Sequence, residues 1–190
     1  VAIDYYSEHI SAIMSDNFRG VYELTKYLIS LGHKDINYVF GHEVYVTEER
    51  IRGFKKALEE EGIPFSDDML IKSKYSEKQP NIDATKVILG RNKLPSAILY
   101  PDDYSAIWGI NTLRAHGLRV PEDISVAGFD GVEIGELVSP RLTTIKQNTS
   151  RMGKQASLKC IQMIESKSDD FTRITVGVEL IPGKSTMAKK

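Results

Sequence analysis

The stretch SAILYPDDYSAIWGINTLRAHGLRVPEDISVAGF, residues 96–129, contains a complete strand–helix–strand unit. Residues 96–100 and 124–129 are short apolar runs that predict buried strands. Between them, apolar residues recur at helical spacing and predict a helix over residues 104–116. A helix that joins two strands of one sheet in this way requires them to run parallel, with a right-handed crossover.

The same alternation continues toward the N-terminus. The chain predicts strands at residues 36–40 and 69–74, each followed by a helix, at residues 48–61 and 81–90. Residues 34–130 therefore predict the order β-α-β-α-β-α-β. The predicted strands are almost continuously apolar, which is typical of a sheet covered by helices on both faces. We predict an α/β fold with a doubly wound parallel sheet.

The segments that flank this alternation predict parts of a second lobe. The chain begins with an extended run and a helix at residues 18–31. After the sheet come extended segments at 142–147 and 172–182, with a helix at about 150–165 between them. The apolar stripe of that last helix includes Cys160, which we expect to lie in a core.

Composition and charge exclude several classes of protein. The 190 residues carry 25 Lys and Arg against 26 Asp and Glu, a net charge of -1, whereas a nucleic-acid-binding surface shows a large basic excess. The single cysteine excludes an internal disulfide and a multi-cysteine zinc site. No run of about 18 apolar residues is present, so no membrane-spanning helix is predicted. The chain opens without an initiator Met or a signal stretch, and we expect a fragment of a longer protein.

The fold itself predicts where a binding site should lie. In doubly wound sheets, ligands bind at the carboxyl ends of the strands. The polar and aromatic residues that follow the predicted strands are Arg50, Tyr75, Asp102, Asp103 and Asp130. Carboxylates accept paired hydroxyl hydrogen bonds, and an arginine donates a planar fork. Together with an aromatic ring that covers the apolar face of a sugar, this set is typical of sugar recognition.

Each of these residues also has a purely structural interpretation. Asp102 or Asp103 precedes a predicted helix and is suited to cap it. Asp130 starts a turn, where Asp is common for local reasons. An arginine on a helix, such as Arg50, is more often solvated than bound, and Tyr75 alone is uninformative. Only the shared position at strand ends favours a binding site.

The sequence contains no motif for catalysis. The four histidines form no pair at metal-ligand spacing, and the Gly-rich phosphate loops and the Gly-x-Ser-x-Gly elbow are absent. We find no nucleophile–base pair, and therefore expect no enzyme, no metal and no cofactor. His33 follows Gly32 at a predicted helix end, where a cation suits the helix dipole.

Two segments resemble signatures of the lactose-repressor/galactose-repressor (LacI/GalR) family. They are LRVPEDISVAGFD at residues 118–130 and PRLTTIKQ at residues 140–147. Three further pieces agree in order and spacing: residues 16–33, the RIRGF run with its following Ala and Leu at residues 50–58, and the Asp pair with its following Ala at residues 102–106. The resemblance covers nearly the whole chain.

The resemblance implies an effector-binding core similar to periplasmic binding proteins, with two lobes joined by three crossovers and the ligand between them. Residues 33–147 resemble the complete C-terminal lobe. Residues 1–32 and 148–180 resemble part of the N-terminal lobe, and residues 181–190 form a C-terminal extension. We expect the earlier strands of that lobe, and the DNA-binding head of such repressors, to be absent from this chain. We also expect exposed apolar surface where partners are missing.

The resemblance assigns roles to residues already selected by position. Arg50 matches the family's effector-contacting arginine, and Tyr75 matches an aromatic residue that packs on the ligand. Asp130 matches the acidic residue that bonds the ligand. Asp102 stands where the family usually has Asn, which binds ligand in many members.

Further positions bear on the shape of the cleft. Asp16, Asn17 and Arg19 lie beside the first crossover, and we expect them to line the cleft. Two positions depart from the family pattern: Gly131 replaces a second acidic residue, and Trp108 stands where Gly is usual. These departures leave the chemistry of the ligand open.

The resemblance also implies a homodimer. In the family, the helix over residues 104–116 and the loop near 132–140 contribute to the subunit interface. Exposed aromatic residues are enriched at such interfaces. We predict an interface that includes Ile107, Trp108, Leu137 and Val138.

Three functional classes follow. The first is the effector-binding region of a cytoplasmic bacterial transcriptional regulator, which senses a sugar or related metabolite and contacts operator DNA only through the missing head. The second is a sugar-binding protein of a transport system, which shares the fold. The RVPED and TTIK motifs favour the repressor. The third, a small flavodoxin-like enzyme or phospho-receiver, is disfavoured because the pair Asp102–Asp103 follows a late strand.

Overall fold

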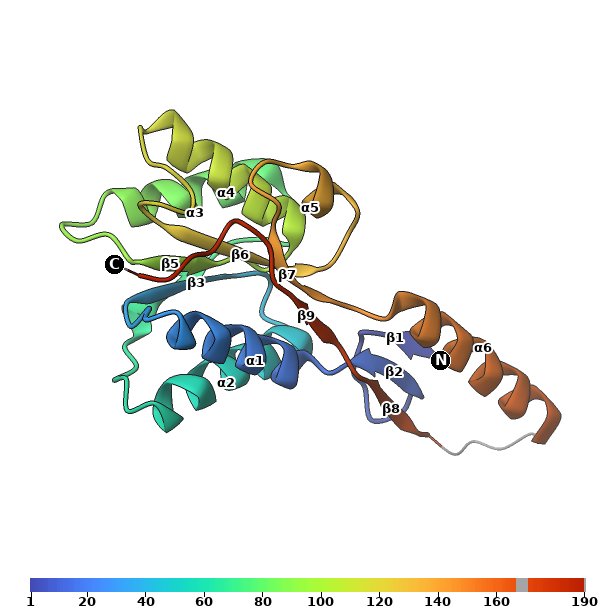
Figure 1. Cartoon of the computed structure of the whole chain (residues 1–190). Coiled ribbons are helices and arrows are strands. Elements are labelled where there is room, and N and C mark those ends of the chain that lie inside the picture. The colour runs from blue at the N-terminus through green and yellow to red at the C-terminus, as the bar shows by residue number, and fades with distance from the viewer. Residues whose placement is uncertain (167–170, 190) are drawn as a thin grey trace.

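The computed structural model describes residues 1–166 and 171–189, which form two lobes of unequal size (Figure 1). The larger lobe is built on a six-stranded sheet in the order β4-β3-β5-β6-β7-β9. Neighbouring strands run parallel, except that β9 is antiparallel to β7. The strands are β3 (Ile36–Phe40), β4 (Leu70–Lys72), β5 (Ala97–Leu99), β6 (Ser125–Asp130), β7 (Thr143–Lys146) and β9 (Glu179–Ile181).

Helices cover both faces of this sheet. In Figure 1, α1 and α2 lie below the sheet and α3 and α4 lie above it, with the short α5 beside α4. A 3-10 turn, η1, leads into β4. The bounds are α1 (Asn17–Ser30), α2 (Tyr45–Glu60), η1 (Asp67–Met69), α3 (Lys78–Leu89), α4 (Asp103–Ala115) and α5 (Ile134–Leu137).

Alternate strand residues point into two separate cores. Tyr38 on β3 packs in one cluster with Leu24 and Phe54 from α1 and α2, whereas the next residue, Val39, packs with Ile88 and Ile110 from α3 and α4. Successive side chains on a strand point to opposite faces, so near-continuous burial requires a layer of helices on each side. The prediction of a doubly wound α/β fold is confirmed.

The smaller lobe is a three-stranded parallel sheet with one helix. Its strands are β1 (Ala2–Ile3), β2 (Ala12–Ser15) and β8 (Arg173–Val176), in the order β1-β2-β8, and its helix is α6 (Thr149–Ser166). Ile13, Met152 and Val176 form the small core between the helix and the sheet. Strand β2 was not predicted from the sequence as a separate element.

Three crossovers join the lobes along the described chain. They are the junction of β2 with α1 at Asp16, the segment between β7 and α6, and the segment between β8 and β9. The first and third are tied together, because the Asp16 N–H donates to the Val176 carbonyl at 2.9 Å. The crossovers therefore form one compact hinge region between the two sheets.

The structure corrects two predicted boundaries. Helix α1 lies in the larger lobe rather than in the N-terminal lobe, because Val21, Leu24 and Leu28 are buried in the core beneath β3. Strand β9 also belongs to the larger sheet, although residues 148–180 were assigned to the smaller lobe. A helical stripe shows which face of a helix is buried, but not which of two sheets covers it.

The outer face of α6 is apolar and exposed. Leu158, Ile161 and Ile164 all point to solvent, and Ile164 retains 77% of its side-chain exposure. The prediction that Cys160 lies in a core is wrong, because it shares this exposed side of the helix. The expected exposed apolar surface is present. None of the helices in the described ranges is both long and apolar enough to cross a membrane.

Candidate functional site

Four segments meet at the carboxyl edge of the larger sheet, next to the crossovers. They are Gly41 after β3, the loop at residues 73–77 after β4, Pro101–Asp102 after β5, and Asp130 at the end of β6. Arg50 on α2 reaches this edge, where its guanidinium bonds the Pro101 carbonyl. The structure thus brings Arg50, Tyr75, Asp102 and Asp130 together at the edge selected from the sequence.

Arg50 is buried and fixed by its neighbours. Its side chain is 3% exposed. The guanidinium Nε donates to Asn17 Oδ1 at 2.7 Å, and Nη1 donates to the Pro101 carbonyl at 2.7 Å. Its central carbon lies 3.7 Å from the centre of the Phe129 ring. The other terminal nitrogen, Nη2, has no hydrogen bond to any residue that the structure describes. The solvated interpretation of Arg50 is therefore wrong.

Asp130 ends β6 in a left-handed conformation, with a φ of 109°. Its Oδ1 accepts a hydrogen bond from Gln147 Nε2 at 2.5 Å, while no described residue donates to Oδ2. Burial raises the pKa of this carboxyl to about 6, although Arg50 opposes the shift. Near neutral pH the group is mostly ionised and can accept hydrogen bonds from hydroxyl groups.

Asp102 caps helix α4 and holds the neighbouring loop. Its side chain is 1% exposed, and its Oδ1 accepts from the Ser105 backbone N–H at 2.8 Å as the N-cap of α4. Its Oδ2 accepts from the Ser105 hydroxyl and from the Ser76 N–H, both at 2.8 Å. The capping interpretation is confirmed for Asp102, and Asp103 is not the cap. The charge of Asp102 contributes to the raised pKa of Asp130.

Tyr75 forms an aromatic wall of the site. Its hydroxyl bonds the Thr47 hydroxyl at 2.6 Å, and its ring stacks on His42 with centroids 6.2 Å apart. A side chain at Gly41 would collide with this ring. The loop that carries Tyr75 is held by Asn81, whose amide donates to two backbone carbonyls of the loop. The ring therefore stands in one fixed orientation.

The residues beside the first crossover play different parts. Asn17 is buried and bonds Arg50, so it orients the guanidinium. Asp16 caps α1 by accepting from the Arg19 N–H at 3.0 Å. The Arg19 side chain is exposed and pairs with Glu23 along the helix, and the structure does not place it with the other site residues.

Gln147 and Ser15 are site residues that sequence reasoning missed. Gln147 donates to Asp130, and its Oε1 accepts from the Ser15 hydroxyl in a close contact. The Ser15 N–H donates to Asp4 Oδ1 at 2.9 Å. Asp130 is thereby linked to two crossovers and to the smaller lobe. Gln147 is the last residue of the PRLTTIKQ motif, and its place in that motif was the sequence signal that could have identified it as a site residue.

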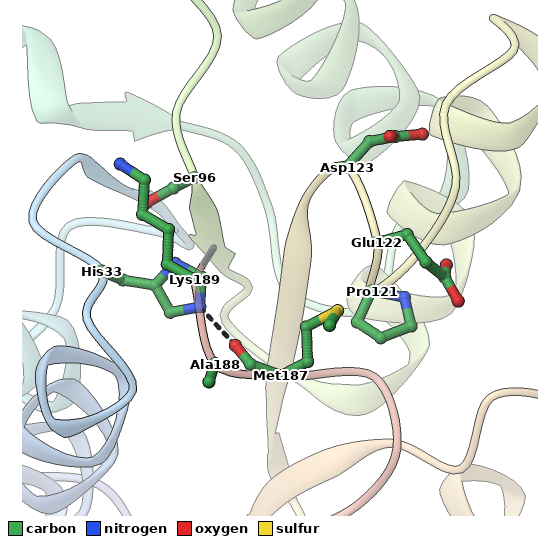
Figure 2. Close-up of a pocket in the computed structure, with 8 residues that line it drawn as sticks. All are labelled: His33, Ser96, Pro121, Glu122, Asp123, Met187, Ala188 and Lys189. Atoms are coloured by element: carbon green, nitrogen blue, oxygen red, sulfur yellow. Dashed lines mark hydrogen bonds between the residues drawn. The ribbon is translucent and has the colours of Figure 1, made fainter.

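A separate pocket lies at the opposite edge of the sheet, at the amino ends of β3, β5 and β6 (Figure 2). Its walls include Pro121 and Glu122, and residues 187–189 close one side. His33 Nε2 donates a hydrogen bond to the Met187 carbonyl oxygen at 3.0 Å. Burial lowers the pKa of His33, so the expected cation at this helix end is wrong. At about 190 Å³ this pocket is small for a sugar-sized ligand.

No three His, Cys, Asp or Glu side chains within residues 1–166 and 171–189 are arranged to hold a metal ion. The donors at the carboxyl edge are instead a guanidinium, amides and hydroxyls around one open carboxylate oxygen. This arrangement suits a neutral, hydroxyl-bearing molecule.

Comparisons with known proteins agree with the fold. A family model described as a periplasmic binding protein-like domain matches residues 25–186. The chain is 35% identical over 184 residues to the transcriptional repressor PurR of Pasteurella multocida, covering 96% of this chain and 55% of that protein. It is 34% identical over 175 residues to the transcriptional regulator DegA of Bacillus subtilis, covering 92% and 51%. The chain thus spans about half the length of these curated relatives.

Solved structures show the same arrangement. A LacI family transcriptional regulator from Enterococcus faecium with bound ribose superposes with a TM-score of 0.88 and 27% identity, covering 97% of this chain and 68% of that one. A complex of the transcriptional regulator CelR with cellobiose gives a TM-score of 0.89 and 25% identity, covering 95% and 55%. The chain belongs to the LacI/GalR family of transcriptional regulators, and its residues 25–186 match the periplasmic-binding-protein-like domain.

Proposed function

We propose that this chain is the ligand-sensing region of a transcriptional regulator, and that it binds a sugar or related metabolite at the carboxyl edge of the larger sheet. The observation that carries the proposal is the placement of Arg50 and Asp130 at one edge of the sheet, where the charge of Arg50 acts on the Asp130 carboxyl. Arg50 is buried and Asp130 is half-buried, and both are oriented by neighbours, yet each keeps one polar atom, Nη2 or Oδ2, without a bond to a described residue. These two atoms offer a donor and an acceptor to one ligand.

A sugar suits this pair because its hydroxyl groups both donate and accept. Asp130 Oδ2 accepts from one hydroxyl and Arg50 Nη2 donates to another. The Tyr75 ring covers an apolar C–H face. Ribose and cellobiose are bound in two structures that superpose on this chain, which supports the sugar class but leaves the individual sugar open.

Sensing requires that the ligand binds one arrangement of the lobes more tightly than another. The Asp130–Gln147–Ser15 link supplies a physical route from the ligand to the lobes, because it joins the Asp130 carboxylate, which bonds the ligand, to two crossovers. On the far side of the hinge, the Arg173 guanidinium of β8 lies 4.0 Å from the centre of the Tyr6 ring and 5.4 Å from that of Tyr45 on α2. A ligand that alters the crossovers changes this contact between the lobes.

The regulator works as a homodimer through α4 and α5. Tyr104 and Trp108 form a ring pair with centroids 6.2 Å apart, and Tyr104 is 46% exposed. Ile107 and Val138 are half-buried, and Leu137 is 74% exposed. Aromatic and apolar side chains gathered on one surface are typical of a protein interface.

The remaining parts of the proposal concern the whole protein. Operator DNA is contacted by a separate DNA-binding head, in the cytoplasm, and the ligand is sensed rather than converted. The curated relatives above are named as repressors and regulators, which favours this reading over a transport protein.

Isothermal titration calorimetry of the natural gene product that contains this chain tests the proposal. The probes are D-ribose, cellobiose and a wider set of mono- and disaccharides. We expect saturable binding of at least one sugar, with one site per chain. A folded protein that binds none of the set would contradict the proposal.

A further inference from the structure

Asp103 is a buried carboxylate that the proposed site does not contact. It is the first residue of α4 and is completely buried. Its Oδ2 accepts from the Val132 N–H at 2.8 Å, and its Oδ1 accepts from the Thr144 hydroxyl at 2.5 Å. One side chain thus ties α4 to the turn after β6 and to β7. Since Asp102 already caps α4, helix capping does not account for Asp103.

The turn that Asp103 holds is conformationally unusual. Asp130 has a φ of 109° and Gly131 a φ of 69°, so two successive residues lie in the left-handed region. A residue with a side chain, such as Asp130, rarely adopts this backbone conformation. The conformation persists only where surrounding contacts impose it. On one side, Gln147 bonds both the carbonyl and the carboxylate of Asp130. On the other side, the bond from Val132 to Asp103 fixes the chain.

The sequence leaves space for this carboxylate. Gly128 lies on β6 opposite Thr144 on β7, and a Cβ at Gly128 would meet Asp103 Oδ1 at 2.5 Å. The carboxylate therefore occupies the volume that a side chain on β6 would fill. It accepts hydrogen bonds there from Thr144 on β7 and from Val132 in the turn after β6.

We propose that Asp103 is a positioning residue for the effector site: it locks the turn at residues 130–132 so that the Asp130 carboxylate faces the ligand. The inference rests on the proposed function, since it assumes that Asp130 bonds the ligand. Asp103 acts through the backbone and does not touch the ligand itself. The ionised carboxylate suits this position, because the Val132 N–H and the Thr144 hydroxyl are both donors.

Substitutions at Asp103 separate positioning from general destabilisation. Asp103→Ala removes both bonds, and we expect at least tenfold weaker sugar binding by calorimetry and fast amide exchange at Val132. Asp103→Asn keeps an acceptor for Val132, and its amide can donate to the Thr144 oxygen, whose hydroxyl can turn toward the Ile145 carbonyl. We expect this variant to recover most of the affinity and the protection of Val132.

The matched control is Asp123→Ala. Asp123 also accepts backbone and side-chain hydrogen bonds, from Arg119, but it lies in the loop before β6 at the opposite edge of the sheet. We expect it to lower the unfolding temperature without changing the sugar affinity. Asp103→Ala with an affinity within twofold of wild type, or with Val132 still protected, would overturn the inference.

Two further outcomes remain decisive. If Asp103→Ala fails to fold, Thr144→Val replaces it, because this near-isosteric change removes one donor only. A threefold or greater loss of affinity then supports the inference, and an unchanged affinity overturns it. If the wild type binds no sugar, the proposed function fails, whereas Val132 exchange in the ligand-free variants still tests whether Asp103 holds the turn.

Discussion

The guanidinium carbon of Arg50 lies 3.7 Å from the centre of the Phe129 ring, and Phe129 immediately precedes Asp130 on β6. A cation over an aromatic face is worth roughly 2 kcal/mol when it is desolvated. The ring therefore supports the guanidinium from the strand that also presents the carboxylate. Strand β6 therefore supports the Arg50 guanidinium through Phe129 and carries the Asp130 carboxylate itself.

Replacing Phe129 with Leu tests this support. Leu keeps the apolar contact of the core but removes the aromatic face beneath Arg50. We expect sugar affinity to fall about five- to thirtyfold, which corresponds to about 1–2 kcal/mol, in calorimetric titrations. Phe54→Leu, in the same core, controls for lost packing. Equal affinities for the two variants would contradict a role for the ring beyond packing.

Ligand binding should depend on pH through Asp130. Burial raises the pKa of this carboxyl to about 6, with Arg50 and Gln147 opposing the shift and Asp102 and Asp4 adding to it. Only the ionised form offers both oxygens as acceptors. We expect sugar affinity to be constant above about pH 7 and to fall as the pH drops from 7 to 5. Calorimetry at several pH values measures this, and a flat profile would argue against Asp130 as a ligand residue.

The free energy of unfolding should depend on pH through the titration of Asp103. Burial raises the pKa of this carboxyl to about 7, although its hydrogen bonds to Thr144 and Val132 oppose the shift, and an Asp in the unfolded chain titrates near 3.9. The native state therefore binds more protons than the unfolded state between about pH 4 and 7. The free energy of unfolding contributed by this group is present below pH 4 and is lost as the pH rises through 7.

The Asp103→Asn variant cannot titrate at this position. We expect its unfolding free energy, measured in urea, to fall less than that of the wild type between pH 4 and 7. The slopes should differ by up to about 1.4 kcal/mol per pH unit. Parallel pH profiles for the two proteins would show that Asp103 does not titrate in this range.

The subunit interface is tested by substitutions on α4 and α5. Leu137→Asp places a charge at an exposed apolar position on α5, and Trp108→Ala removes the largest ring on α4. We expect both variants to shift a dimer toward monomer in analytical ultracentrifugation. Val87→Asp, at an exposed apolar position on α3, should leave the dimer constant unchanged. A dimer constant unaffected by both test variants would place the interface elsewhere.

The larger lobe was predictable from the sequence because its elements follow strict periodicities. The apolar run at residues 36–40 coincides with β3, and the stripe at residues 104–116 lies within one residue of α4. The position of Arg50, Tyr75 and Asp130 at one edge followed from the parallel order of the strands. The motifs added residue roles that periodicity alone could not supply.

Other features depend on contacts that a pattern does not encode. The placement of α1 follows from which sheet its apolar stripe meets. Cys160 lies on a regular helical stripe, yet it is exposed, because the side of α6 that faces the small sheet carries Met152 and Lys159 instead. The pKa of His33 is lowered because the returning C-terminal segment buries it, and its ring bonds a residue 154 positions away along the chain. The roles of Gln147 and Asp103 likewise arise from neighbours on separate elements.

The central claim is that Arg50 and Asp130 together bind the ligand, and a double-mutant cycle measures it most directly. Calorimetry with the tightest-binding sugar would compare the wild type, Arg50→Ala, Asp130→Ala and the double variant. We expect each single variant to lose about 2–5 kcal/mol of binding free energy, as when one partner of a buried charged hydrogen bond is removed. We also expect the double variant to lose less than the sum of the two. Single variants that bind within twofold of the wild type would contradict the account.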